Sequence, residues 1–262
     1  MFNKKLWKRK TMNNYKKLES GRSMIEMLGV LAIIGVLSVG GIAGYSKAMN
    51  KFKTNKVADN VSMIVTNIRT LYAQQKTYDG LDNVSAVAMG VVPDELVTKA
   101  SDGTLTNAFL GSVHIGAGTV SGMDGETGAS TGANRGFFVI MNGLPKEACV
   151  TLATNDWGSG YSSGLVGIVA SGSAQSADSA AVQSVNCTGG EVKSASNNIG
   201  GNGTALASAG IELTADGAAA TAKPFAACVN GTGDGKTPMN VAKAAAVCSS
   251  TSNTNSILWK FY

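Results

Sequence analysis

The chain has one histidine, four cysteines and four prolines in 262 residues. With His114 as the single histidine and no C-x-x-C pair, a metal site would need all four cysteines at irregular spacing. We therefore expect no metal and no cofactor.

Charge is absent from one long segment. Met27–Ser46 contains no Asp, Glu, Lys or Arg over 20 residues. A helix of that length spans about 30 Å, which matches the hydrocarbon core of a bilayer. We predict a transmembrane segment at about residues 24–45.

A single carboxylate, Glu26, stands just before this uncharged run. A charge within a membrane helix costs about 2.5–3.5 kcal/mol, and less near the interface. Glu26 is therefore expected to have a cationic partner, which points to a subunit built for assembly.

The segment before Glu26 is strongly basic. Residues 1–21 hold seven Lys or Arg and one Glu, so the net charge falls from +5 for the whole chain to −1 for residues 22–262. A basic segment before a membrane helix is retained in the cytoplasm. The cluster therefore indicates membrane topology, and no nucleic-acid partner is expected from charge.

The run from Gly21 to Glu26, with its apolar continuation, resembles the class III signal of type IV prepilins. In that family a prepilin peptidase cuts after the glycine, which would make Arg22 the first mature residue and Glu26 the fifth. The family methylates the new terminal amine, and the glutamate pairs with the amine of a neighbouring subunit. Arg22 departs from the pattern, because this position is usually apolar.

The resemblance also implies partners and location. The partners would be further copies of the chain, a prepilin peptidase, and an assembly ATPase acting through an inner-membrane platform protein. Lipid would surround the helix before assembly. The precursor would lie in the inner membrane and the mature protein in an extracellular pilus.

The fold class expected is α+β, with a long N-terminal helix packed on an antiparallel sheet head. The helix would cover residues 22–78, with a transmembrane half and an amphipathic half, and the head residues 79–262. Apolar residues recur at spacings of three and four in the second half: Val57, Val61, Ile64, Ile68 and Leu71.

Within the head, residues 79–135 indicate a connecting region with a short helix at Pro93-Asp94-Glu95 and a strand around Val113 and Ile115. An Ala/Ser/Gly-rich tract at about residues 171–222 indicates a long surface loop. Further elements are expected as follows: strands at Gly136–Met141, Leu165–Ala170 and the terminal SILWKFY, and helices at Leu144–Asp156 and Met239–Val247.

Four cysteines in an exported domain suggest two disulfides, and three pairings are possible. The GLPKEACVTL segment, a late cysteine and the terminal strand resemble type IVb pilins of the conjugative and enteric-adhesin kind. In these pilins the cysteine after the middle helix pairs with the one near the C-terminus. The resemblance therefore implies Cys149–Cys248, which leaves Cys187–Cys228.

Enzymatic activity is not expected. Gly160-Tyr-Ser162-Ser-Gly164 satisfies the G-x-S-x-G pattern, but an α/β-hydrolase needs its histidine after the serine, and His114 comes before it. The function expected is that of a structural subunit of a type IV pilus, serving adhesion, aggregation, motility or conjugation. The alternatives are a minor pilin, a pseudopilin of a type II secretion system, and a membrane-anchored adhesin that does not polymerise.

Overall fold

A computed structural model describes residues 24–75, 77–120, 132–158, 163–175, 185–188, 191–194, 225–229 and 236–262. The chain divides into two compact units, one ending at Lys47 and the other beginning at Ala48. The predicted leader, residues 1–21, lies outside the described residues.

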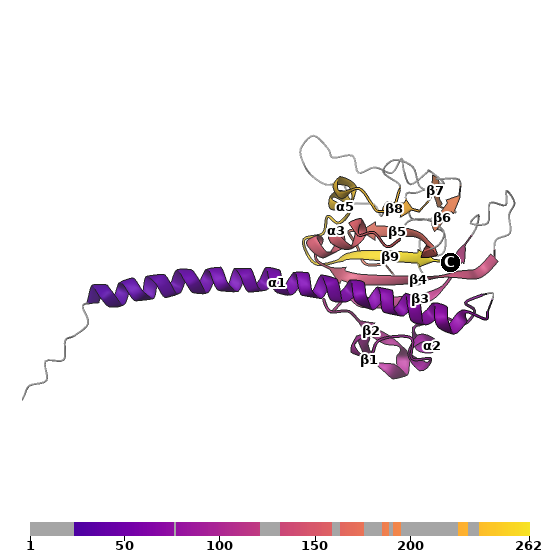
Figure 1. The fold of residues 1–262 in the computed structure, drawn as a ribbon, viewed down its shortest axis with the longest axis horizontal. Helices are drawn as coiled ribbons and strands as arrows, with labels where there is room; N and C mark the ends of the chain where they lie inside the picture. The colour runs from indigo at the N-terminus through magenta and orange to yellow at the C-terminus, as the bar shows by residue number, and fades with distance from the viewer. Residues whose placement is uncertain are drawn as a thin grey trace, which may run out of the picture. The chain divides into compact units, whose positions relative to one another are not determined.

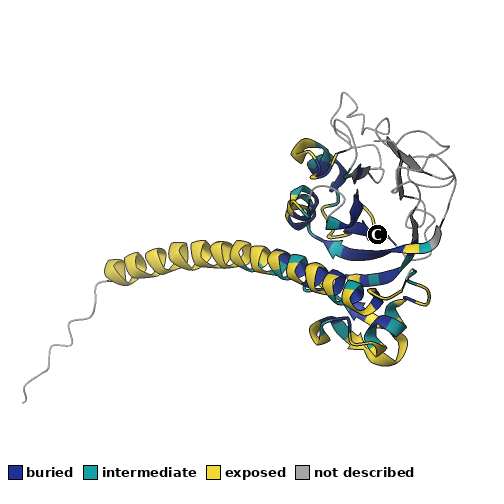
Figure 2. Ribbon diagram, turned by 45° about the vertical axis from the view of Figure 1, so that its right-hand side comes forward, coloured by how far each residue is buried: buried dark blue, intermediate teal, exposed yellow. Residues whose placement is uncertain are grey.

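The long helix α1 (Met24–Tyr72) belongs to both units. Its first half is exposed throughout, whereas its second half has a buried face (Figure 2). Figure 1 shows this second half lying along the sheet of the head. The helix thus has one half that packs within its own chain and one that does not.

Two details of α1 differ from the sequence prediction. The helix ends at Tyr72 rather than at residue 78, and Leu71, expected on the buried face, is 47% exposed. Tyr72 occupies the buried position instead, where its ring centroid lies 5.2 Å from that of Tyr78. Because Tyr78 must fold back onto the helix to make this contact, the helix cannot continue to it.

The head is an antiparallel sheet of seven strands in the order β1-β2-β3-β4-β9-β5-β8. The C-terminal strand β9 therefore lies in the middle, between β4 and β5. The strands are β1 (Val97–Lys99), β2 (Thr104–Thr106), β3 (Ser112–Val120), β4 (Gly132–Leu144), β5 (Leu165–Ser171), β8 (Phe225–Cys228) and β9 (Asn255–Phe261).

The main core lies between α1 and the sheet. Alternate residues of the central strands face it, as the two-residue period of a strand requires. Val139 of β4 and Ile168 of β5 both pair in register with Trp259, whose side chain is fully buried. The α+β arrangement of a long helix on an antiparallel sheet is therefore as expected.

Short elements complete the head. They are α2 (Asn83–Ala88), the 3-10 turns η1 (Asp94–Leu96) and η2 (Ala100–Asp102), α3 (Lys146–Thr154) and α5 (Val241–Val247). The connecting region at residues 79–135 is consequently more regular than its sequence indicated, since it holds α2, β1 and β2 in addition to β3, the strand expected around Val113 and Ile115.

The Ala/Ser/Gly-rich tract also contains regular structure. β6 (Val185–Thr188) and β7 (Glu191–Ser194) form a separate antiparallel pair, with Cys187 opposite Val192. The tract that we interpreted as a long surface loop thus contains one short hairpin. Most of the tract lies outside the described residues.

Candidate functional site

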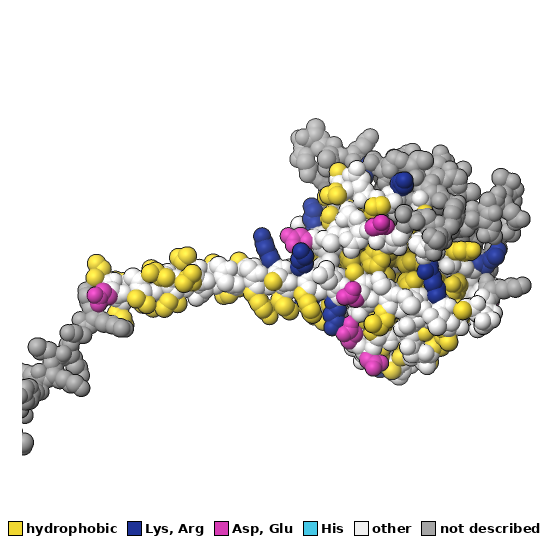
Figure 3. All heavy atoms as spheres, viewed as in Figure 1, with side chains coloured by type: hydrophobic (Ala, Val, Ile, Leu, Met, Phe, Trp, Pro, Cys, Tyr) yellow, Lys and Arg dark blue, Asp and Glu magenta, His cyan; other side chains and the backbone are white. Residues whose placement is uncertain are grey.

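The first half of α1 presents an uninterrupted apolar surface. Its large side chains are from 50% to 84% exposed within the chain, and Figure 3 shows hydrophobic atoms distributed along it. Among the described residues, α1 is the one helix long and apolar enough to cross a membrane, with a mean hydropathy of 2.2 over its most apolar window. Such a surface needs lipid or protein to cover it.

Glu26 lies in the first turn of α1 and is exposed. A carboxylate at this position interacts favourably with the positive end of the helix dipole. No other acidic residue occurs on α1 before residue 59. Gly21 and Arg22, the predicted cleavage and methylation positions, lie outside the described residues.

The second half of α1 is tied to the connecting region by polar contacts. Lys56 Nζ lies 2.7 Å from Glu95 Oε2, and Asn67 Nδ2 donates a hydrogen bond of 3.0 Å to the Val91 carbonyl. The hydrogen bond from Lys56 is the main reason that the pKa of Glu95 is lowered. These contacts fix η1 and the preceding turn against the helix.

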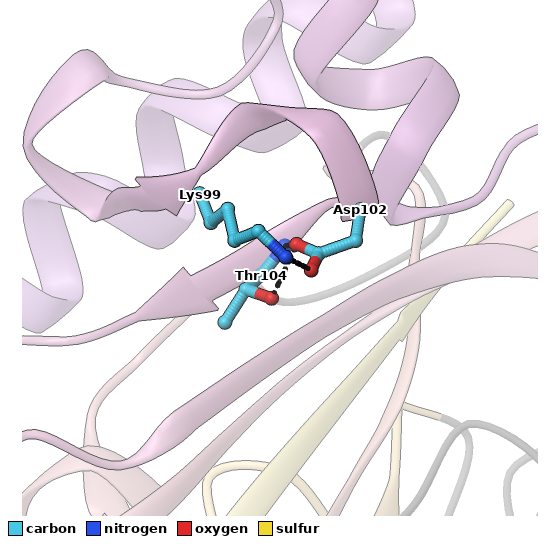
Figure 4. Close-up of polar contacts among 3 residues, drawn as sticks. All are labelled: Lys99, Asp102 and Thr104. Atoms are coloured by element: carbon cyan, nitrogen blue, oxygen red, sulfur yellow. Dashed lines mark hydrogen bonds and ion pairs between the residues drawn. The ribbon is translucent and has the colours of Figure 1, made fainter.

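Asp102 organises the turn between β1 and β2 (Figure 4). Its carboxylate pairs with Lys99 and accepts a hydrogen bond of 2.6 Å from the Thr104 hydroxyl. Together these partners, Lys99 first, lower the pKa of Asp102 to about 2. The cluster is solvent-exposed and serves the turn, so it offers no binding site.

A disulfide joins Cys149 of α3 to Cys248, the residue after α5. Both cysteines are fully buried, and their Cα atoms are 5.9 Å apart. The bond therefore holds the two short helices together. The side chains of Cys187 and Cys228, the other predicted pair, lie outside the described residues.

The start of β9 is locked to the end of β4 by one side chain. Asn255 Nδ2 donates hydrogen bonds of 3.0 Å to the carbonyls of Leu144 and Ser250, and its Oδ1 accepts one from the Ser250 amide. Because the residue is fully buried, leaving these groups unpaired would be costly. Asn255 comes soon after the disulfide-bonded Cys248 in the sequence, and its hydrogen bonds fix the position of the terminal strand β9.

The serine of the G-x-S-x-G segment and the single histidine lie in different parts of the sequence, and only the histidine belongs to the described residues. His114 lies on β3, where it pairs in register with Ile140, and Ser162 lies outside the described residues. Among the described residues there is also no cluster of three or more His, Cys, Asp or Glu that could hold a metal ion.

Sequence reasoning missed a second buried layer on the opposite face of the sheet. It contains Lys260, whose side chain is fully buried and whose pKa burial lowers to about 8. It also contains a polar network in which Asn142 contacts the backbone of Gln175, and the Gln175 amide donates a 2.9 Å hydrogen bond to Ser256. The burial of these polar residues depends on the order of the strands, so no pattern within a short window of the sequence indicated it.

Comparisons with known proteins agree on one family. The family model described as PilS N terminal matches residues 51–200. The major structural subunit of the bundle-forming pilus of Escherichia coli O127:H6 is 30% identical over 149 residues, which cover 57% of this chain and 70% of that protein. The toxin coregulated pilin of Vibrio cholerae serotype O1 is 26% identical over 158 residues, covering 58% and 66%.

Two solved structures are also similar. The type IV b pilin from Salmonella typhi has 15% sequence identity and a TM-score of 0.37, covering 77% of this chain and 94% of that one. TcpA from Vibrio cholerae El Tor has 14% identity and a TM-score of 0.39, covering 80% and 99%. The family match over more than half of the chain carries the assignment: this protein belongs to the PilS N-terminal family and is a type IVb-like pilin.

Proposed function

We propose that this pilin is made as an inner-membrane precursor, is cleaved after Gly21, and polymerises through the first half of α1 into a surface filament. The observation that carries the proposal is the exposed apolar half-helix with Glu26 in its first turn. None of the described residues buries this surface. In a filament, equivalent helices of neighbouring copies would cover it.

Glu26 would provide the specific contact. Cleavage would place a new α-amino group four residues before Glu26, and the ammonium of one copy would pair with the carboxylate of the next. Both charges would then be compensated in a dry environment, where either one alone is penalised. Arg22 would carry the amine that is methylated in the family, and its guanidinium offers Glu26 a second cation.

The domain division follows from this scheme. Residues 1–21 would be the leader, residues 22–72 the assembly helix, and the remainder the head exposed on the filament surface. A prepilin peptidase would remove the leader, and an assembly ATPase with an inner-membrane platform protein would extract the subunit. Catalysis has no part in the scheme, in keeping with the structural role of the bundle-forming pilus relative.

The test is the Glu26→Ala variant expressed in the native host. We expect normal membrane insertion but strongly reduced filament yield in material sheared from cells. Glu147→Ala is the matched control, because it removes an exposed carboxylate from the first turn of α3 instead. Equal filament yield from Glu26→Ala and the control would contradict the assembly role.

Processing is tested separately by Gly21→Arg. We expect this variant to keep residues 1–21 and to stay in the membrane fraction, as judged by intact-mass measurement. A mature-sized chain from Gly21→Arg would show that cleavage occurs elsewhere. A parent chain that remains unsheared in the membrane would favour the anchored-adhesin alternative.

A further inference from the structure

A cavity of about 610 Å³ opens in the head where the chain leaves α1. Residues from the end of α1, the following turn, β4 and the C-terminus line it together. Its volume falls in the range of about 300–1,000 Å³ that is typical of small-molecule sites. Nothing in the pilus scheme above uses this cavity.

Among the described residues, the lining of the cavity contains two arginines, Arg69 and Arg135, and no acidic side chain. The Nη2 atom of Arg69 is buried and has no hydrogen-bond partner. Burial lowers the pKa of Arg69, and Tyr78 opposes the effect. Because Nη2 is enclosed, a ligand in the cavity would meet the other nitrogens of the guanidinium, and an anionic ligand would offset the charge of Arg69.

Gly164 makes room for this guanidinium. A Cβ atom placed on Gly164 would lie 2.1 Å from Arg69 Nη2, and its φ of +63° is in any case unfavourable for other residues. The Gly164 carbonyl also accepts a 2.8 Å hydrogen bond from the Tyr262 amide. A side chain at position 164 would therefore displace the Arg69 guanidinium from its place.

Aromatic rings pack against one another beside Arg69. Ring centroids are 5.2 Å apart between Tyr72 and Tyr78, 4.8 Å between Tyr78 and Phe137, and 5.3 Å between Phe137 and Phe261. The Arg69 guanidinium carbon lies 5.2 Å from the centre of the Phe261 ring. Cation–π contact and packing therefore fix both the rings and the guanidinium before any ligand arrives.

The remaining side chains of the lining could form hydrogen bonds with the hydroxyl groups of a ligand. Tyr72, Tyr78 and Tyr262 contribute rings with a polar end, while Gln75 and Thr77 contribute an amide and a hydroxyl. The nearby carboxylate of Asp79 does not line the cavity and is engaged by Thr77 and Asn134 at 2.6 Å each. These hydrogen bonds lower the pKa of Asp79 and keep it charged, so it offsets part of the positive charge that the two arginines bring to the cavity.

We propose that this cavity binds a sugar acid, with its carboxylate between Arg69 and Arg135 and its ring against the tyrosines. Guanidinium groups bind carboxylates through paired, charge-assisted hydrogen bonds. Tyrosine offers an apolar face for the C–H groups of the sugar and a hydroxyl for its oxygens. A single Asp or Glu side chain of another protein would occupy only a small part of the volume.

The test measures binding of glucuronic acid to the full chain in detergent micelles by saturation-transfer NMR. Glucose and free glutamate are the two reference compounds, because each lacks one half of the proposed ligand. We expect glucuronic acid to bind at millimolar concentration or below, and both references to bind more weakly. No binding of glucuronic acid, or equal binding of glucose, would overturn the proposal; equal binding of glutamate would assign the site to acidic side chains instead.

The residues are tested with Arg135→Gln, because Arg135 is exposed and its loss should not prevent folding. We expect affinity for glucuronic acid to fall about tenfold or more, since a hydrogen bond to a charged group is removed. Lys146→Gln, which removes an exposed positive charge outside the lining, should change affinity by less than about twofold. Equal effects of the two substitutions would refute the role of Arg135. Arg69→Lys keeps the positive charge but removes the planar guanidinium. If this variant binds glucuronic acid as tightly as the parent does, the carboxylate is not held by paired hydrogen bonds from Arg69.

Discussion

Lys260 shows how one residue can set the pH response of the head. It lies on the central strand β9, pairs in register with Phe138 of β4 and Gly167 of β5, and is fully buried. Gly118 lies beside its side chain, and a Cβ there would make an ordinary van der Waals contact of 3.6 Å with Lys260 Cε. Burial disfavours the ammonium form, which is why its pKa falls to about 8.

This shift predicts a rise in stability with pH. Between about pH 8 and the ordinary lysine pKa of 10.5, the unfolded chain holds a proton that the folded chain has lost, so the free energy of unfolding increases with pH. Lys260→Met should remove this slope.

The measurement is urea unfolding of both proteins in the same detergent from pH 7 to pH 10. Tyr72 and Tyr78 have raised pKa values, mainly through burial, and act in the opposite direction at higher pH. They are present in both proteins and cancel in the difference. If the difference in the free energy of unfolding between parent and variant stays constant from pH 7 to pH 10, the pH dependence does not come from Lys260.

At the scale of elements, α1 changes its role along its length. Val57, Val61, Ile64 and Ile68 are fully buried against the head. Neighbouring positions on the same turns, such as Met63, are half exposed. The helix therefore stabilises the head through one narrow buried face, and its opposite face remains exposed.

We predict that Ile64→Ala destabilises the head by about 2–5 kcal/mol, because it removes buried methyl groups and leaves a cavity. Met63→Ala is the matched control on the adjacent position, and it should change the free energy of unfolding by no more than about 0.5 kcal/mol. Denaturant midpoints in the same detergent compare the two. Similar losses for both variants would mean that the buried face is assigned wrongly.

The disulfide between α3 and α5 is the second device at this scale. It joins residues separated by 99 positions, so it restricts a large part of the unfolded chain. For a closed loop of about 100 residues, loop-closure entropy gives a stabilisation of about 4–5 kcal/mol.

The double substitution Cys149→Ala and Cys248→Ala should lower the free energy of unfolding by about 3–5 kcal/mol. Replacement by alanine avoids effects of reductant on the other cysteines. The single substitution Val150→Ala, on the partly buried neighbour in α3, controls for local packing. A double variant as stable as the parent would show that the two helices dock without the bond.

The sequence predicted those elements whose signals are local. β4, α3, β5, α5 and β9 were expected from apolar runs and turn residues, because buried strands and short helices show these patterns. α2 was missed although Asp82 and Ser85 form its capping box, a signal readable at a spacing of three. Glu26 was identified from its isolation in an uncharged run, whereas the disulfide pairing depended on resemblance.

The burial of Lys260 and the arginine cavity could not be predicted in this way. Each depends on residues brought together from distant parts of the chain by the strand order. Arg69, Arg135 and Tyr262 line one cavity because the end of α1 meets β4 and β9 at the same edge of the core. No pattern within a short window of sequence encodes this meeting.

At the scale of the whole molecule, the two units contribute differently to stability. Residues 24–47 contain no buried residue, so they add nothing to the core of the head. Their apolar surface instead decides what the protein must associate with. Folding of the head and association of the helix should therefore be separable.

We predict that a chain beginning at Ser46 is soluble without detergent and keeps the denaturant midpoint of the complete protein. Ser46 would stand before the remaining helix, where a serine hydroxyl can cap the first amide groups. The change in midpoint should correspond to less than about 1 kcal/mol, because no buried contact is lost. Ser46→Ala in the shortened chain should lower the free energy of unfolding by about 0.5–2 kcal/mol if the new helix start is capped in this way.

The unfolding of the complete and shortened chains can be compared by circular dichroism in urea. A shortened chain that unfolds at much lower denaturant would mean that the first half of α1 supports the head, and the separation of assembly from folding would have to be abandoned.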